Sequence, residues 1–191
     1  MIMSRISMPM PVFYPNNNYY YHKLMWKFFT DNESGKRDFI YKVVDTNDSI
    51  DIYVISATEP IPFDMKAKVS SKHLPDDFFS HGLYEFMLKA NVTKSRASDG
   101  KVVSVTSEED IELWMNRKAA NNGFRVNSMG FSKNPNRILG KPGHDVYLNP
   151  VDFTGVIEVE DIDKFRHAVL NGIGRNKGMG FGMLMVKPIT E

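Results

Sequence analysis

The sequence predicts an α+β protein built from two tandem ferredoxin-like (RRM-like) domains. In the second half, runs of strand and helix periodicity follow in the order β-α-β-β-α-β, which is the split unit of this fold. The first half repeats the same order with a degraded second helix. We therefore predict an N-terminal domain of residues 1–94 and a C-terminal domain of residues 95–191, divided at the polar stretch 95–101.

In the N-terminal domain, one helix follows an opening strand. Residues 3–13 are expected as a strand, and its prolines favour an edge position. An asparagine cap within 16–18 then precedes a helix, whose apolar stripe has the i, i+3, i+4, i+7, i+8 spacing and consists of Tyr21, Leu24, Met25, Phe28 and Phe29. The runs 38–45 and 49–57 read as a hairpin, 62–82 as either a strand or a short helix, and 83–94 as a strand.

The C-terminal domain carries clearer helix boundaries. After the strand "KVVSV", Ser107 is a candidate N-cap with Asp110 at the N3 position, and Gly123 ends that helix. The strands "FRVNSMGF" and "VDFTGVIEVE" flank a long basic loop, 132–144. Asp161 opens a second helix, which leads into a glycine-rich tail and a last strand.

Composition narrows the class of protein. Of the 191 residues 42% are hydrophobic, enough for an ordinary globular core. The absence of cysteine excludes disulfides and zinc–thiolate sites. No apolar run approaches the roughly 20 residues that span a bilayer, and no signal peptide is evident, so a cytoplasmic protein without membrane association is expected.

Charge is unevenly distributed although the net charge is only +1. No Asp or Glu occurs in residues 113–144 or 164–190, while both stretches contain several lysines and arginines. A solvated surface is the ordinary explanation for one such stretch. Two of them together favour a surface that binds a polyanion.

The tail "GIGRNKGMGFGML" (172–184) has the glycine content of a phosphate-binding loop but not its context. A dinucleotide fingerprint needs a strand before the glycines and a helix after them, and here the order is reversed; a Walker loop would end in Gly-Lys-Ser/Thr. No nucleotide cofactor is therefore expected. If 178–186 is a strand, one face is bare backbone, which either another part of the protein or a nucleic-acid backbone could approach closely. The glycines of this motif, any of which could permit such an approach, are Gly172, Gly174, Gly178, Gly180 and Gly182.

The same tail resembles the glycine-rich C-terminal signature of the repeat-associated mysterious protein superfamily of CRISPR systems. It is most similar to the CasE-type endoribonucleases of the type I-E Cascade complex. Three further stretches fit that family in order: "YYYHKLMWKFF", "ELWMNRKAANNGFRV" and "FTGVIEVEDIDKFRHAVLNGIG". Together these anchors span most of the chain.

The resemblance implies an enzyme that cuts CRISPR precursor RNA at the base of the repeat hairpin without metal and stays bound to the mature guide RNA. Its partners would be that RNA hairpin and the other Cascade subunits. The family's catalytic histidine matches His22, and a tyrosine three residues earlier matches Tyr19, although any of the tyrosines at 19–21 could take that place. A non-catalytic RNA-binding scaffold is the alternative, and the histidine on the first helix favours the enzyme.

The residues are compatible with this chemistry. At about 100° per residue, His22 lies at the margin of the apolar stripe, between Tyr19 and Trp26 on one side of the helix. RNA supplies its own nucleophile, the 2′-hydroxyl, so a histidine can act as general base or acid and a tyrosine can assist, giving a 2′,3′-cyclic phosphate and a 5′-hydroxyl. No Asp/Glu/His cluster has metal-ligand spacing, so no metal is expected.

Cations for RNA binding are expected on the first helix, in the two acid-free stretches and in the glycine-rich tail. The loop 132–145 could project into an RNA stem and contact its phosphates, since side chains cannot read the deep major groove of an A-form stem. Each cation could equally be an ordinary surface charge. The candidates are Lys23, Lys27, Arg117, Lys118, Arg125, Lys133, Arg137, Lys141, Arg175 and Lys177.

Overall fold

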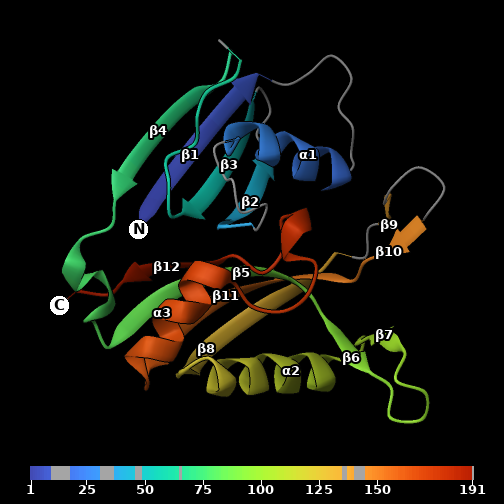
Figure 1. The fold of residues 1–191 in the computed structure, drawn as a ribbon. Helices are drawn as coiled ribbons and strands as arrows, with labels where there is room; N and C mark the ends of the chain where they lie inside the picture. The colour runs from blue at the N-terminus through green and yellow to red at the C-terminus, as the bar shows by residue number, and fades with distance from the viewer. Residues whose placement is uncertain are drawn as a thin grey trace. The chain divides into compact units, whose positions relative to one another are not determined.

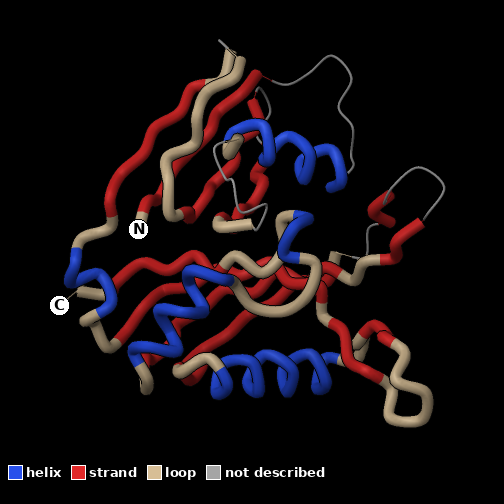
Figure 2. The backbone as a smooth tube through the Cα atoms, in the orientation of Figure 1, coloured by secondary structure: helices blue, strands red, loops and turns tan. Residues whose placement is uncertain are grey.

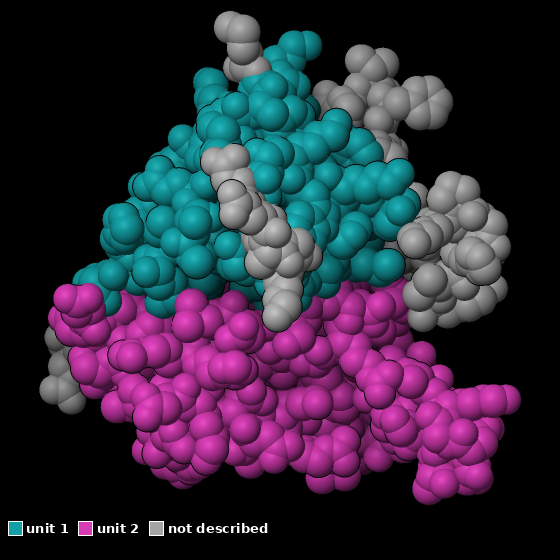
Figure 3. All heavy atoms as spheres, viewed as in Figure 1, with its two compact units in different colours: residues 1–75, 138–146, 178–180 teal, residues 76–137, 147–177, 181–191 magenta. Residues whose placement is uncertain are grey.

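The computed structural model divides the chain into two compact units (Figure 3). Unit 1 comprises Met1–Pro75, Ile138–Val146 and Gly178–Gly180, and unit 2 the remainder. The structure describes residues 1–9, 18–30, 37–45, 49–64, 66–134, 137–139 and 145–190, with only the backbone at 137–139 and 145–147. Within these ranges no helix has the length and apolar character needed to cross a membrane.

Unit 1 contains one four-stranded antiparallel sheet covered on one face by a helix (Figure 1). The strand order is β2-β3-β1-β4. A second helix would stand between β3 and β4, but residues 57–64 and 66–67 are loop, as Figure 2 shows. The elements are β1 (Ile2–Pro9), α1 (Asn18–Phe28), β2 (Phe39–Asp45), β3 (Ser49–Ser56) and β4 (Lys68–His73).

The core of unit 1 lies between α1 and the sheet. Leu24, Met25 and Phe28 are buried on the inner face of the helix, as its periodicity predicts. They meet the inward positions of the strands, among them Ile6 and Ile52, which are fully buried. Burying this stripe fixes the rotation of α1 about its axis, and therefore the direction of its other side chains.

Unit 2 is a complete ferredoxin-like domain with the strand order β12-β5-β11-β8. Its two α-helices cover the same face of the sheet (Figure 1). In the core between them, the rings of Trp114 and Phe153 stack 6.1 Å apart. The elements are η1 (Asp76–Phe79), β5 (Leu83–Asn91), β6 (Thr93–Ser95), β7 (Val102–Ser104), α2 (Glu108–Asn121), β8 (Phe124–Lys133), β11 (Pro150–Val159), α3 (Ile162–Asn171) and β12 (Leu184–Pro188). A two-stranded ribbon, β9 (Arg137–Leu139) with β10 (Asp145–Tyr147), and a short η2 (Lys177–Met179) complete the chain.

The prediction of two ferredoxin-like domains is confirmed, but the division between the units does not lie at residue 94. The strand expected to close the N-terminal domain, β5, is the first strand of unit 2 and pairs with β11 and β12. The run "KVVSV" supplies only the short β7, which forms a hairpin with β6, and 96–101 lies in its turn. The alternation of apolar and polar residues identified β5 as a strand. Which sheet it joins depends on pairing with strands far away in the sequence, which the alternation does not show.

The predicted helix caps are present in unit 2. The Ser107 side chain accepts from the Asp110 amide at 3.3 Å, and the Asp161 carboxylate accepts from the Lys164 amide at 3.1 Å. Each cap satisfies an amide that the first turn of a helix leaves without a partner. These local signals fix the start of α2 and α3.

A buried carboxylate lies in the sheet of unit 1. Asp51 on β3 is only 4% exposed, and its Oδ2 accepts from Nη2 of Arg5 on β1 at 2.7 Å. This hydrogen bond holds the pKa of Asp51 below its ordinary value, against the opposite effect of burial, and Ser7 lowers it further. The ionised carboxylate therefore stabilises the folded unit.

Replacing Asp51 by asparagine is expected to lower the free energy of unfolding by about 1 kcal/mol at neutral pH, since the Arg5 guanidinium stays solvated. Because folding lowers the pKa of Asp51, its contribution is complete above the unfolded value of about 3.9 and is lost as the pH falls through the folded value. Urea denaturation of both proteins at neutral and acidic pH measures this difference.

The matched control is Glu85→Gln, which removes an exposed ion pair with Lys187 at 3.6 Å and should have almost no effect. A stability difference for Asp51→Asn that does not shrink on acidification contradicts the assignment.

Candidate functional site

The sequence placed His22 at the margin of the apolar stripe of α1, and the structure confirms that position. The side chain is half-buried. Tyr19, one turn earlier, has its ring 6.0 Å from the imidazole at an interplanar angle of 18°, and Trp26, one turn later, meets it edge-on at 6.5 Å. The imidazole therefore lies in an aromatic setting that restricts its orientation.

Two side chains of unit 1 donate to one backbone carbonyl. His22 Nδ1 lies 2.9 Å from the Gly178 oxygen, and the Tyr41 hydroxyl donates to the same oxygen at 2.8 Å. Tyr41 stands on β2 and is fully buried, which raises the pKa of its phenol and keeps it protonated. Residues 178–180 belong to unit 1, so this arrangement is internal to that unit.

The Gly178 carbonyl determines the tautomer of His22. A carbonyl oxygen only accepts, so the hydrogen bond requires the proton on Nδ1. In the neutral ring the lone pair then resides on Nε2. No hydrogen bond among the described residues occupies Nε2, so this nitrogen is available to take a proton from a bound molecule.

The glycine-rich tail is not the bare strand expected over 178–186. β12 begins only at Leu184, and Lys177–Met179 forms a short 3-10 turn. Gly180 and Gly182 have φ of +80° and +81°, which side chains rarely adopt and which interrupt an extended strand. The alternation of small and large residues suggested a pleat, but left-handed glycines coil this segment instead.

Contacts within unit 1 hold residues 178–180 in place. Besides the two bonds to Gly178, Asn18 at the start of α1 donates to the Met179 carbonyl at 2.6 Å. A Cβ at Gly180 would lie 3.2 Å from the Tyr41 ring, so the backbone passes directly over that side chain. Gly180 thus allows the backbone to approach another group closely, and in this structure that group is the Tyr41 side chain.

Within unit 2, the rest of the tail is bound to its surroundings. Lys177 Nζ donates to the carbonyls of Asn171 and Gly172 at the end of α3, at 2.9 and 3.1 Å. Asn91 Nδ2 donates to Asn176 at 2.8 Å, and Arg175 forms a backbone bridge with Asn91. Lys177, predicted to bind RNA, has a structural role in capping α3.

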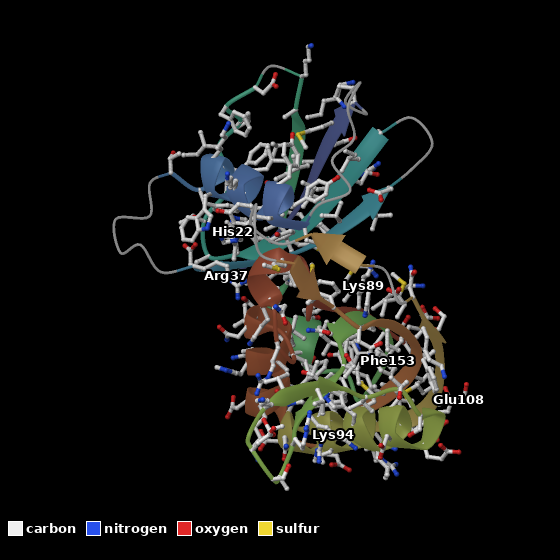
Figure 4. All side chains as sticks on the ribbon, turned by 90° about the vertical axis from the view of Figure 1, so that its right-hand side faces the viewer. His22, Arg37, Lys89, Lys94, Glu108 and Phe153 are labelled. Atoms are coloured by element: carbon white, nitrogen blue, oxygen red, sulfur yellow. The ribbon has the colours of Figure 1, made fainter. Side chains whose placement is uncertain are left out.

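One cation that the sequence analysis did not single out lies beside His22. Arg37 precedes β2, and its Nη1 lies 3.4 Å from the position that a Cβ on Gly178 would take; His22 Nδ1 lies at the same distance from that point. Figure 4 shows the two labelled side chains next to each other. Arg37 is half-buried, and loss of hydration lowers its pKa.

No sequence pattern pointed to Arg37 or Tyr41. Arg37 stands in a polar stretch of sequence without periodicity, and Tyr41 reads as an ordinary core residue of a strand. We name Gly178 with His22, Tyr41 and Arg37 the Gly178 site.

Several predicted RNA-binding cations are paired with carboxylates. Arg125 donates to Glu158 at 2.6 Å, and Lys133 lies 3.1 Å from Glu108. These carboxylates belong to other helices and strands. A stretch of sequence that contains no acidic residue can therefore still have acidic side chains next to it in the folded protein. Among the described residues, no carboxylate lies within 4.0 Å of the remaining candidates Lys23, Lys27, Arg117, Lys118 and Arg175. The side chains of Arg137 and Lys141 lie outside the described residues.

Three of these remaining candidates lie over aromatic rings. Lys23 Nζ is 4.7 Å from the Tyr19 ring, Lys27 Nζ is 5.4 Å from Phe63, and Lys118 Nζ is 5.6 Å from Trp114. Lys23 and Lys27 are exposed on α1, the helix that carries His22. In the described part of the chain, no group of three or more His, Asp or Glu side chains could hold a metal ion.

Comparison with known proteins identifies relatives over nearly the whole chain. The sequence model of the family described as "CRISPR associated protein" matches residues 3–188. The CRISPR system Cascade subunit CasE of Escherichia coli is 25% identical over 184 residues, covering 90% of this chain and 92% of that protein. The CRISPR-associated endoribonuclease Cse3 of Thermus thermophilus is 28% identical over 117 residues, 54% of each chain. A structure of Thermus thermophilus Cse3 bound to an RNA representing a pre-cleavage complex has the same fold, with a TM-score of 0.84, 20% identity and coverage of 98% and 99%.

Replacing Tyr41 by phenylalanine is expected to lower the free energy of unfolding by about 1 kcal/mol, the usual net contribution of one hydrogen bond. The cost stays small because the Gly178 oxygen keeps its bond from His22 and the ring volume is unchanged. Urea denaturation measures it. Tyr53→Phe on β3 is the control, and equal effects of both substitutions contradict the stated role of the Tyr41 hydroxyl.

Proposed function

The chain belongs to the family of CRISPR associated proteins, and we propose that it is a metal-independent endoribonuclease that cleaves CRISPR precursor RNA at the base of the repeat hairpin. The names of its relatives, a Cascade subunit and an endoribonuclease, support this activity. We infer likewise that the protein stays bound to the mature guide RNA together with other Cascade subunits, in the cytoplasm.

The observation that carries the proposal is the hydrogen bond from His22 Nδ1 to the Gly178 carbonyl. It leaves Nε2 as the proton acceptor of a neutral imidazole. It also gives the imidazolium formed after proton uptake an acceptor for its Nδ1 proton. Orienting a base through its second nitrogen is the arrangement that general base catalysis by histidine requires.

In the proposed reaction, Nε2 of His22 takes the proton of the 2′-hydroxyl as its oxygen attacks the adjacent phosphorus. The new bond joins the 2′-oxygen to phosphorus, and the bond from phosphorus to the 5′-oxygen breaks. The leaving oxygen takes up a proton and becomes a 5′-hydroxyl, while the phosphate remains as a 2′,3′-cyclic ester. The nucleophile comes from the RNA, so the step needs no metal-bound water.

Tyr19 is the proposed assisting residue. Its ring stacks on that of His22, and it lies on the same side of α1. Of the tyrosines at 19–21, Tyr21 is buried against the core and Tyr20 is exposed. Tyr19 therefore has the best position to donate a proton to the leaving oxygen or to position the substrate. Lys23 and Lys27 on the same helix are proposed to contact RNA phosphates.

The reaction class is tested with the CRISPR repeat hairpin of the source genome, incubated with the protein in EDTA. We expect cleavage in EDTA and none when the nucleotide at the cut site carries a 2′-deoxy sugar, because the nucleophile is then missing. Cleavage that depends on added magnesium, or that tolerates the deoxy sugar, contradicts the mechanism. Tight binding of the unmodified hairpin without cleavage would instead identify a scaffold protein.

The role of His22 is tested by replacing it with alanine. Loss of a general acid or base is expected to slow cleavage by about 10²- to 10⁴-fold under single-turnover conditions. The matched control is His73→Ala, an exposed histidine on β4, at the sheet edge opposite β2. Cleavage at the unchanged rate by His22→Ala would remove His22 from the mechanism.

A further inference from the structure

Arg37 is a cation in an unusual electrostatic position. Its guanidinium is half-buried, and in the described part of the chain no carboxylate lies within 4.0 Å of it. The neighbouring phenol of Tyr41 cannot serve as a counter-ion at neutral pH, because burial raises the pKa of Tyr41. Holding a cation away from water without an anion costs folding free energy. An anion supplied from outside would recover that cost.

The location of Arg37 relates it to the proposed reaction. Its Nη1 and His22 Nδ1 both lie 3.4 Å from the same point beside Gly178, so the two nitrogens are no more than twice that distance apart. A base acting on a 2′-hydroxyl must lie next to the phosphate that the hydroxyl attacks. Arg37 is therefore within reach of a phosphate whose adjacent 2′-hydroxyl contacts His22. Figure 4 shows the two labelled side chains beside each other.

We propose that the Arg37 guanidinium binds the non-bridging oxygens of the scissile phosphate and stabilises the negative charge of the transition state. This role rests on the proposed function, because it takes the phosphate to be the one next to the 2′-hydroxyl that His22 activates. Arginine suits it, since its planar fork matches two phosphate oxygens. A partly desolvated cation acts more strongly than the exposed lysines of α1, whose charge is screened by water.

The contrast with Arg5 in the same unit supports a role outside structure. Arg5 donates to a buried carboxylate at 2.7 Å and so contributes to folding. Among the described residues Arg37 has no such bond, so its removal is expected to leave stability unchanged or raise it.

The test compares Arg37→Gln, Arg37→Lys and the wild-type protein in single-turnover cleavage of the repeat hairpin. We expect Arg37→Gln to slow cleavage by about 10²-fold, the usual effect of losing one donor to a developing anion. Arg37→Lys should fall between the two, because it keeps the charge but not the fork. Affinity for the 2′-deoxy hairpin should fall much less than the rate does, and the thermal midpoint should not fall.

Lys72→Gln is the matched control, since it removes an equal charge from the exposed edge strand β4 of the same unit. We expect its cleavage rate and affinity to equal those of the wild type. A similar loss in this variant would mean that overall charge, and not a contact to the scissile phosphate, is responsible.

Sulfur substitution at the scissile phosphate separates a direct contact from a structural role. Replacing one non-bridging oxygen by sulfur should slow cleavage by the wild type. For at least one diastereomer it should slow cleavage by Arg37→Gln less, since the sulfur and the Arg37 substitution remove the same contact between the guanidinium and that oxygen. Identical sulfur effects in both proteins, or an Arg37→Gln rate within about twofold of the wild type, overturn the proposal. After such a result, the His22→Ala rate in the same assay separates the two proposals. If His22→Ala is slow, only the role of Arg37 has failed. If His22→Ala cleaves at the wild-type rate, the proposed function has failed.

Discussion

The carbonyl oxygen of Gly178 accepts hydrogen bonds from His22 and from Tyr41, and the proposed chemistry depends on this shared acceptor. Because a carbonyl cannot donate, it assigns the Nδ1 proton of His22 and leaves Nε2 as the base of the proposed reaction. Tyr41 contributes a hydroxyl whose proton is retained through burial. Together with the bond from Asn18 to Met179, these contacts hold a backbone segment that sets the tautomer of His22.

The core of unit 1 and the Gly178 site depend on the same helix. Burial of Leu24, Met25 and Phe28 fixes the rotation of α1 and thereby places His22 at the margin of the buried face. A histidine further around the helix would be solvated and mobile, and one within the stripe would be inaccessible. Packing and reactivity are thus joined through the 3.6-residue period of one helix.

Arg5 and Arg37, both in unit 1, lie in different electrostatic environments. The Arg5 guanidinium is exposed and bonded to Asp51, while that of Arg37 is half-buried beside His22 without a carboxylate among the described residues. In unit 2, Arg125 and Lys133 pair with carboxylates of other elements. Pairing reduces the value of a cation for binding RNA, so counts of basic residues along the chain overstate the size of an RNA-binding surface.

The sequence alone determined the fold class, the rotation of α1 and the caps at Ser107 and Asp161, because periodicity and capping are local properties. It also marked His22, both by its position on the helix and by resemblance. It did not assign β5 to its sheet or reveal Arg37 and Tyr41, and it mistook the coiled glycines for a strand. Only the tertiary structure decided these points: strand partners and the 156-residue separation of His22 from Gly178 are non-local, and nothing in the pattern of neighbouring residues records them.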